Sequence, residues 1–297
     1  ADRLPDHYAE LAHHFARAEE WKKVMDYSVL AGQRAGHAFA NAEAKAHFGR
    51  ALEVAGKLTP PPDPPILVSL HQKHGAVLMV LAEYEEAAAE YLRALELVRR
   101  VGDRRAEIEI LVALSTVYLL YHQPKPSIQY MDQALAIEPE LNDRSLRAFC
   151  LAQRVIVRAG GYGHIPETVA DAEEALRLAG EIRSPRRLAQ TLGWVGGLFQ
   201  WRGEFDRSLE CLHRAVEVAG REHAGFVFGQ AAFQIGNAYT GKGEYEEALR
   251  WYRRLGDYAS AAGDKFWLSR VPNLIGGVHL EVFDLDNGAL RRSIDLG

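Results

Sequence analysis

The chain has 297 residues, of which 48% are hydrophobic and 25% charged, a composition typical of a globular protein with a substantial core. Its formal net charge of -5 argues against nucleic-acid binding, because a phosphate-binding surface needs concentrated lysine and arginine. It has only two cysteines and no apolar run near the roughly 20 residues that span a bilayer, so we expect a cytoplasmic protein that does not enter a membrane.

Three helices are expected in the first part of the chain. The first, over residues 5–17, places Tyr8 and Phe15 on one apolar face at helical spacing. The second runs from residue 20 to about 35, and the third follows Asn41, which we expect to be its N-cap. Three helices of this kind cannot bury their apolar faces alone, so they need a neighbouring layer.

A proline-rich segment follows these helices. Residues 59–65, with the sequence TPPPDPP, lack backbone donors and forbid a helix. We therefore predict N-terminal helices over residues 1–58, a linker over 59–65 and a longer helical region over 66–297. The chain begins with Ala1 rather than methionine and stops inside an expected helix, so we expect a fragment of a longer protein.

From Ile66 onward one pattern returns about every 40 residues, which indicates an internal repeat. The first helix of most units carries a small residue at an equivalent position: Gly75, Ser115, Gly196, Gly236 and Gly276. Each second helix has packing positions spaced four and then three residues apart: Ala87, Tyr91 and Ala94; Ser127, Met131 and Ala134; Thr168, Ala172 and Ala175; Ser208, Leu212 and Ala215; Ala248, Tyr252 and Leu255. The pattern gives five full units and a truncated sixth, whose second helix would begin near Gly288.

These residue types have a packing role. A small side chain at a helix crossing lets the two axes approach, while a large one fills the groove of the neighbouring helix. Each unit then contacts mainly the units next to it, which gives a quasi-one-dimensional stack. We therefore predict an all-α fold, a right-handed α-solenoid of antiparallel helix pairs, with a concave face made chiefly by the first helices.

The repeat resembles the tetratricopeptide repeat. The resemblance rests on a small residue before an aromatic, as in Gly236 with Tyr239, on the turn glycine Gly243, and on the Ala-x3-Tyr-x2-Ala signature. It covers Ile66 to the C-terminus well and residues 5–58 loosely, and its period is about 40 rather than 34. The resemblance implies a scaffold that binds a protein or peptide in its concave groove.

Two narrower similarities suggest a signalling context. The G-N-A-Y sequence at 236–239 is similar to the longer repeats of signalling adaptors and of regulators of the maltose-activator type. The N-terminal helices are similar to the segment that follows the nucleotide-binding domain in large bacterial signalling ATPases, many of which carry adenylate or guanylate cyclase domains. This similarity implies that any ATPase or cyclase activity lies outside the present chain.

Nothing in the sequence supports catalysis, a cofactor or a metal. Residues 236–243 satisfy G-x4-G-K, but the last position is Gly243 rather than Ser or Thr, and the first half lies in an expected helix. His71 and His74 have the spacing of a metal-binding pair, yet no third ligand accompanies them. We therefore expect packed or solvated histidines and helix-packing glycines.

The resemblance also identifies candidate groove residues. Amides can donate and accept at once, which suits a peptide backbone, and tryptophan and arginine often anchor binding hot spots. The expected concave positions in the later units are Gln153, Arg154, Gln190, Trp194, Gln200, Trp201, Gln230, Gln234, Asn237, Arg270 and Asn273. An equal alternative is that Trp194 and Trp201 pack between helices and that the amides are merely solvated.

Three functions remain open. The first is a non-catalytic protein-interaction or regulatory module of a larger cytoplasmic signalling protein. The second is a small-molecule sensor that controls an attached ATPase or cyclase. The third is self-association of the chain, and the three differ in what binds rather than in the fold.

Overall fold

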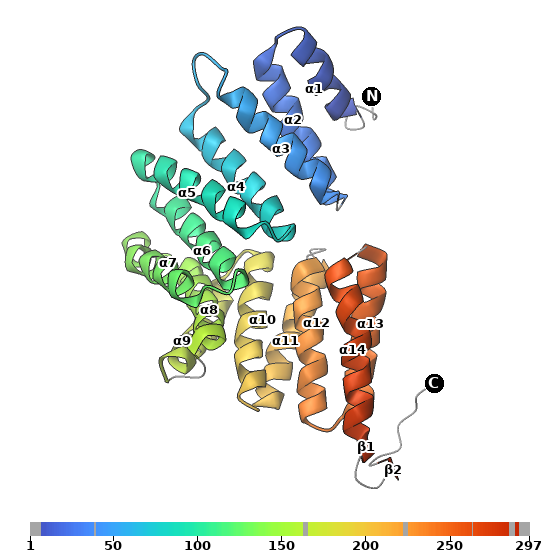
Figure 1. The fold of residues 1–297 in the computed structure, drawn as a ribbon. Coiled ribbons are helices and arrows are strands. Elements are labelled where there is room, and N and C mark those ends of the chain that lie inside the picture. Colours follow the sequence, from blue (N-terminus) through green and yellow to red (C-terminus); the bar gives the residue numbers. More distant parts are fainter. Residues whose placement is uncertain are drawn as a thin grey trace. The chain divides into compact units, whose positions relative to one another are not determined.

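The structure, a computed structural model, describes residues 7–284 and 289–290, except 39, 163–165, 222–224 and 263. The described residues are almost entirely helical, which confirms the predicted all-α class (Figure 1). The chain divides into two compact units, Ala1–Leu141 and Asn142–Gly297. Each unit is a stack of antiparallel helix pairs, as expected for a solenoid.

Unit 1 contains seven α-helices and a short 3-10 turn among its described residues. Their bounds are α1 Tyr8–Arg17, α2 Trp21–His37, α3 Asn41–Ala55, α4 Pro64–Val80, α5 Tyr84–Val101, α6 Arg104–Leu120, α7 Pro124–Ile137 and η2 Glu138–Leu141. The helices α2 and α3, α4 and α5, and α6 and α7 pack as successive pairs. Asn41 is the first residue of α3 rather than its N-cap, which is Ala40, so that expectation was wrong by one position.

The proline-rich segment lies between α3 and α4. Its last residues, Pro64 and Pro65, form the first turn of α4, where a missing backbone N–H costs nothing. Both helices belong to unit 1, and they contact each other. A domain boundary at 59–65 stays a prediction, whereas the chain divides into its two compact units after Leu141.

Unit 2 continues the pairing with α8/α9, α10/α11 and α12/α13, followed by α14. The bounds are α8 Arg144–Tyr162, α9 Pro166–Leu178, η3 Ala179–Glu181, α10 Pro185–Trp201, α11 Phe205–Arg221, α12 Gly225–Gly241, α13 Tyr245–Ala262 and α14 Lys265–Val282. A two-residue strand β1, Phe283–Asp284, pairs antiparallel with β2, Ala289–Leu290. Apart from β2, residues 285–297, where the sixth second helix was expected, lie outside the described residues.

Helix starts follow the expected capping chemistry. The Asp103 carboxylate accepts the Ala106 N–H at 3.0 Å, and Asp143 does the same for Leu146 at 3.0 Å. Ser184 and Asp264 accept from the backbone of α10 and α14 in the same way. These side chains satisfy backbone donors that a helix start leaves without partners, so α6, α8, α10 and α14 begin at defined residues.

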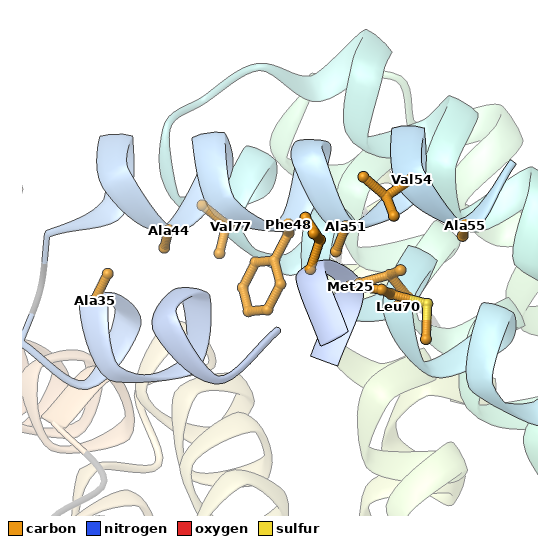
Figure 2. Close-up of a cluster of buried hydrophobic side chains, with 10 residues drawn as sticks. Met25, Ala35, Ala44, Phe48, Ala51, Val54, Ala55, Leu70 and Val77 are labelled. Atoms are coloured by element: carbon orange, nitrogen blue, oxygen red, sulfur yellow. The ribbon is translucent and has the colours of Figure 1, made fainter. Parts of the chain in front are cut away.

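The small and large positions meet as predicted. A Cβ added at Gly75 would lie 2.9 Å from the Tyr91 ring, and one added at Gly196 would lie 2.8 Å from Leu212. In α12, Gly236 lies against the ring of Tyr252 even more closely. In unit 1, Phe48 projects from α3 into the cluster shared by α2, α3 and α4 (Figure 2). At Gly75, Gly196 and Gly236, glycine therefore sets the helix spacing within its pair.

Candidate peptide-binding surface

The first helices of unit 2 lie next to one another in order. Helix α8 packs on α10, and α10 packs on α12. Helix α14 reaches α12 through Trp267, whose indole Nε1 lies 2.5 Å from where a Cβ at Gly229 would stand. The predicted groove residues all belong to these four helices, so they share one layer of the unit.

The middle of this layer carries two unsatisfied amides. The Gln234 side chain of α12 lies on the α10 backbone at Gly197, where an added Cβ would be 2.7 Å from Nε2. Gln234 is only 9% exposed, and its Oε1 has no hydrogen-bond partner among the described residues. Gln200, one turn from Gly197 on α10, also has a buried Oε1 without such a partner. Two acceptors without partners, the Oε1 atoms of Gln234 and Gln200, therefore lie near Gly197 of α10.

Asn237 connects this layer to the second helices. The Tyr252 hydroxyl donates to Asn237 Oδ1 at 2.7 Å. Burial raises the pKa of Tyr252, so the hydroxyl keeps its proton and remains a donor. Asn237 is partly exposed, and its carbonyl is occupied by this bond. Its amide group is the part that a ligand can use.

Two predicted residues on α8 have structural partners. Gln153 is 1% exposed, so it lies in the interior and not on the surface of the layer. Arg154 donates from Nε and Nη2 to the two carboxylate oxygens of Asp171 on α9, each at 2.6 Å. Arg158 lies 3.8 Å from the same carboxylate. The charge of Arg154 is therefore matched within the unit, and Gln153 needs a rearrangement to reach a ligand.

The two predicted tryptophans differ: one packs between helices, and the other is exposed on the layer. Trp194 is partly buried and packs on Phe149 of α8 with ring centroids 5.5 Å apart. Trp201, at the end of α10, is 43% exposed. The glutamines on the same layer, Gln190 and Gln230, are partly exposed. Trp194 is thus largely an interhelical residue, while Trp201 offers an aromatic surface to a ligand.

Helix α14 exposes the remaining predicted residues. Asn273 is exposed, and the Arg270 guanidinium lies 3.6 Å from the centroid of Phe266. The sequence pattern did not select Asp171 or Gly197, because each acts through contact with another helix, nor Phe266, which contacts Arg270 within α14. A second glycine directly after the anchor Gly196 was the one signal that a close approach occurs there.

The two motifs that suggested other chemistry have packing roles. Gly236 and Gly241 lie in α12, and Gly243, with φ of 73°, forms the turn that follows. His71 Nδ1 lies 2.5 Å from Glu90 Oε2 on α5, and His74 Nδ1 lies 3.6 Å from Oε1. Within the described part of the chain, no three His, Cys, Asp or Glu side chains form a group suited to a metal ion.

The antiparallel helix pairs are stacked, and within a pair a small residue of the first helix packs against a large side chain of the second. This arrangement defines a solenoid of helix pairs. Residues 65–140 and 187–257 match the family model of the tetratricopeptide repeat. These two segments are therefore tetratricopeptide repeats, as the sequence pattern predicted. No curated protein matches it.

Solved structures share this fold at low identity. A Rap protein complexed with Competence and Sporulation Factor has a TM-score of 0.67 and 16% identity, over 94% of this chain and 85% of that one. A signal transduction ATPase with a tetratricopeptide repeat sensor, from Pyrococcus horikoshii, has a TM-score of 0.58 and 12% identity, over 97% of this chain and 45% of that one. A thermophilic tetratricopeptide repeat protein of Thermus thermophilus has a TM-score of 0.52 and 17% identity, over 70% of this chain and 98% of that one. At these identities the likeness shows the fold alone.

Among the helices that the structure describes, none has the length and apolar character to cross a membrane.

Proposed function

We propose that the chain is a non-catalytic interaction module of a larger bacterial, cytoplasmic signalling protein, and that the layer of α8, α10, α12 and α14 binds an extended peptide. The observation that carries this proposal is the pair of amides, Gln234 and Gln200, whose acceptors lack partners beside Gly197. Both Oε1 atoms are buried, so the two side chains must turn outward before the regularly spaced N–H donors of an extended backbone can satisfy them. Trp201 and Asn237 flank this position with an aromatic surface and a free amide group.

The energetics favour a neutral backbone ligand. An unsatisfied buried acceptor costs about 1 to 3 kcal/mol, and a ligand donor recovers part of that cost on binding. Arg154 is already paired with Asp171, so this part of the layer offers no free positive charge to an acidic group. A Rap protein of the same fold was solved in complex with Competence and Sporulation Factor, which supports a bound partner for this architecture.

The test begins with peptides selected from a random display library on the intact chain. Gln234→Ala removes the unsatisfied acceptor, and we expect it to weaken the selected peptide by about 1 to 3 kcal/mol. Gly197→Ala places a Cβ where the Gln234 amide lies, so it should displace that amide and weaken binding as well. Titration calorimetry measures both effects.

Two matched variants control for composition and helix content. Gln129→Ala removes an exposed glutamine in α7 of unit 1, and Gly220→Ala adds a methyl group on α11, where an added Cβ meets nothing within 4 Å among the described residues. Neither should alter affinity. Unchanged binding by Gln234→Ala, with helicity intact, would remove the amide pair from the proposed site.

A small-molecule sensor is the second candidate. The Pyrococcus horikoshii protein carries a tetratricopeptide repeat sensor in a signal transduction ATPase, and its fold matches 97% of this chain. A metabolite that raises the melting temperature in proportion to its affinity would support sensing, because a ligand that binds only the folded state stabilises it. No hit across a broad metabolite panel would favour the peptide.

Self-association is the third candidate. On α14, Phe266, Leu268 and Leu280 are 48%, 40% and 62% exposed, which is a large apolar surface for one helix. Light scattering over a range of protein concentrations tests it. A constant molecular mass would exclude association through this helix.

A further inference from the structure

A second surface of unit 2 lies mainly on the second helices, with two side chains from α12. Six side chains from α11, α12 and α13 contact one another in one row, with tilted or edge-on rings, which we call the aromatic ladder: Tyr239, His213, Trp251, Arg254, Phe228 and Tyr258. The His213 and Trp251 ring centroids are 5.3 Å apart, and those of Phe228 and Tyr258 are 5.1 Å apart. Each ring contacts the next, so the row is a continuous and ordered surface.

Arg254 is the cation in the row. Its Cζ lies 4.7 Å from the Trp251 centroid and 5.3 Å from the Phe228 centroid. The side chain is exposed and makes no ion pair with any described carboxylate, including Asp257 one turn later on α13. Stacking orients the planar guanidinium while leaving its N–H edge available, which is the geometry that a carboxylate accepts in two parallel bonds.

Another arginine that lies over an aromatic ring in the same unit offers a comparison with Arg254. The Arg207 guanidinium lies 4.0 Å from the Phe199 centroid, yet it also donates to Glu173 at 2.7 Å and to Glu204 at 2.8 Å. Its charge is matched inside the chain. Arg254 has aromatic support without these carboxylates, so its N–H groups are available to a carboxylate of another molecule.

The neighbouring side chains give this surface the composition of a binding hot spot. Trp251, Tyr239, Phe228 and Tyr258 are all partly exposed, and tryptophan, tyrosine and arginine are the residues that dominate interface energies. His213 Nε2 lies 3.2 Å from the Tyr239 hydroxyl, and burial, together with the Arg254 charge, lowers the pKa of His213. The imidazole is therefore held as a mainly neutral surface, and the ladder carries one concentrated positive charge.

We propose that the aromatic ladder docks an acidic segment of a partner protein. A glutamate or aspartate carboxylate accepts two N–H bonds from Arg254, and an adjacent apolar side chain packs on Trp251. Charge complementarity supports this occupant, because the exposed Arg253 beside the ladder also lacks a described ion-pair partner, whereas the nearby Glu247 is paired with Arg250. This surface differs from the proposed peptide layer in its groups: four of its six side chains lie on α11 and α13, and Phe228 and Tyr239 of α12 are not among the predicted groove residues.

The test uses a short synthetic peptide that alternates glutamate and leucine, and the same peptide with glutamine in place of glutamate. Binding to the intact chain is followed by the indole N–H resonance of Trp251. The glutamate peptide should shift this resonance, and Arg254→Gln should weaken the affinity about tenfold, as expected for loss of a charge-assisted pair. Arg253→Gln removes an adjacent exposed charge without aromatic support, and it should leave the affinity within about twofold, as a surface charge contributes little.

Three outcomes would overturn the proposal: equal binding of the glutamine peptide, equal losses from Arg253→Gln and Arg254→Gln, or no Trp251 shift at millimolar peptide. Free glutamate and inorganic phosphate serve as further probes. If either binds as tightly as the peptide, the ladder is a small-anion site and not a protein-docking surface. Gln234→Ala should leave peptide binding here unchanged, so failure of the ladder is distinguishable from failure of the amide layer.

Discussion

Gly236→Ala tests the packing rule on which the whole fold depends. Gly236 lies where α12 crosses α13, and an added Cβ would overlap the Tyr252 ring. That ring is 2% exposed and is held at its far end by the bond to Asn237 at 2.7 Å, so it cannot turn away without losing a partner. The methyl group must therefore move a helix axis or break this bond.

The expected loss follows from three contributions. Overpacking a tight core costs about 1 to 3 kcal/mol, and loss of the Tyr252 hydrogen bond adds about 1 kcal/mol. Alanine offsets about 1 kcal/mol because it favours helix more than glycine does. We therefore expect Gly236→Ala to lower the free energy of unfolding by about 1 to 3 kcal/mol.

Denaturant unfolding followed by tryptophan fluorescence measures the change where it occurs. Four of the five tryptophans are in unit 2: Trp194, Trp201, Trp251 and Trp267. Gly276→Ala is the matched control, because Gly276 occupies the equivalent position on α14 but an added Cβ there meets nothing within 4 Å among the described residues. It should stabilise the chain by up to about 1 kcal/mol through helix propensity.

A compensating change sharpens the test. The unit with Ser115 tolerates a Cβ at the anchor, and it has the flexible Met131 at the position equivalent to Tyr252. Adding Tyr252→Met to Gly236→Ala should therefore recover part of the lost stability, since methionine adapts to an irregular space. If Gly236→Ala is as stabilising as Gly276→Ala, the glycine is not a packing spacer and the reasoning fails.

Two further predictions concern the buried carboxylates Glu90 and Asp171. The pKa of Glu90 falls to about 2, because the bonds from His71 and His74 outweigh the burial that raises it. Its ionised form stabilises the fold above the ordinary pKa of 4.5 and loses this effect as pH falls toward 2, so Glu90→Gln should flatten the fall in melting temperature over that interval. Arg154→Ala should cost about 1 to 3 kcal/mol in denaturant unfolding by leaving the Asp171 carboxylate poorly paired, and Asp171→Ala should restore part of this. Weaker peptide binding by Arg154→Ala without a stability loss would assign that residue to the ligand.

The repeat could be predicted because its determinants are close in sequence. A small residue and its large partner, such as Gly75 and Tyr91 or Gly196 and Leu212, lie in consecutive helices at a constant separation. Caps such as Asp103 and Ser184 act on residues three positions away. Local spacing therefore carries both the helix boundaries and the contacts inside each pair.

The candidate surface was less accessible to the same reasoning, because helix rotation decides which side chains face outward. Gln153 and Arg154 are adjacent in the sequence, yet one is buried and the other is bound to Asp171 on the next helix. The Gln234 contact with Gly197 joins different repeat units, and no spacing within one unit encodes it. Amide composition alone indicated a binding layer but not which amides remain unsatisfied.

The two surfaces proposed on unit 2 use different recognition chemistry. On the first helices, Asp171 neutralises Arg154, and the unsatisfied groups are neutral amides such as Gln234. On the second helices, Arg254 keeps an unmatched charge on an aromatic support. Neutral acceptors recognise donors by direction at short range, whereas a cation attracts an acidic group over about a Debye length of 10 Å. The proposed peptide and the proposed acidic partner would therefore use different groups of unit 2, and neither would compete for the groups that bind the other.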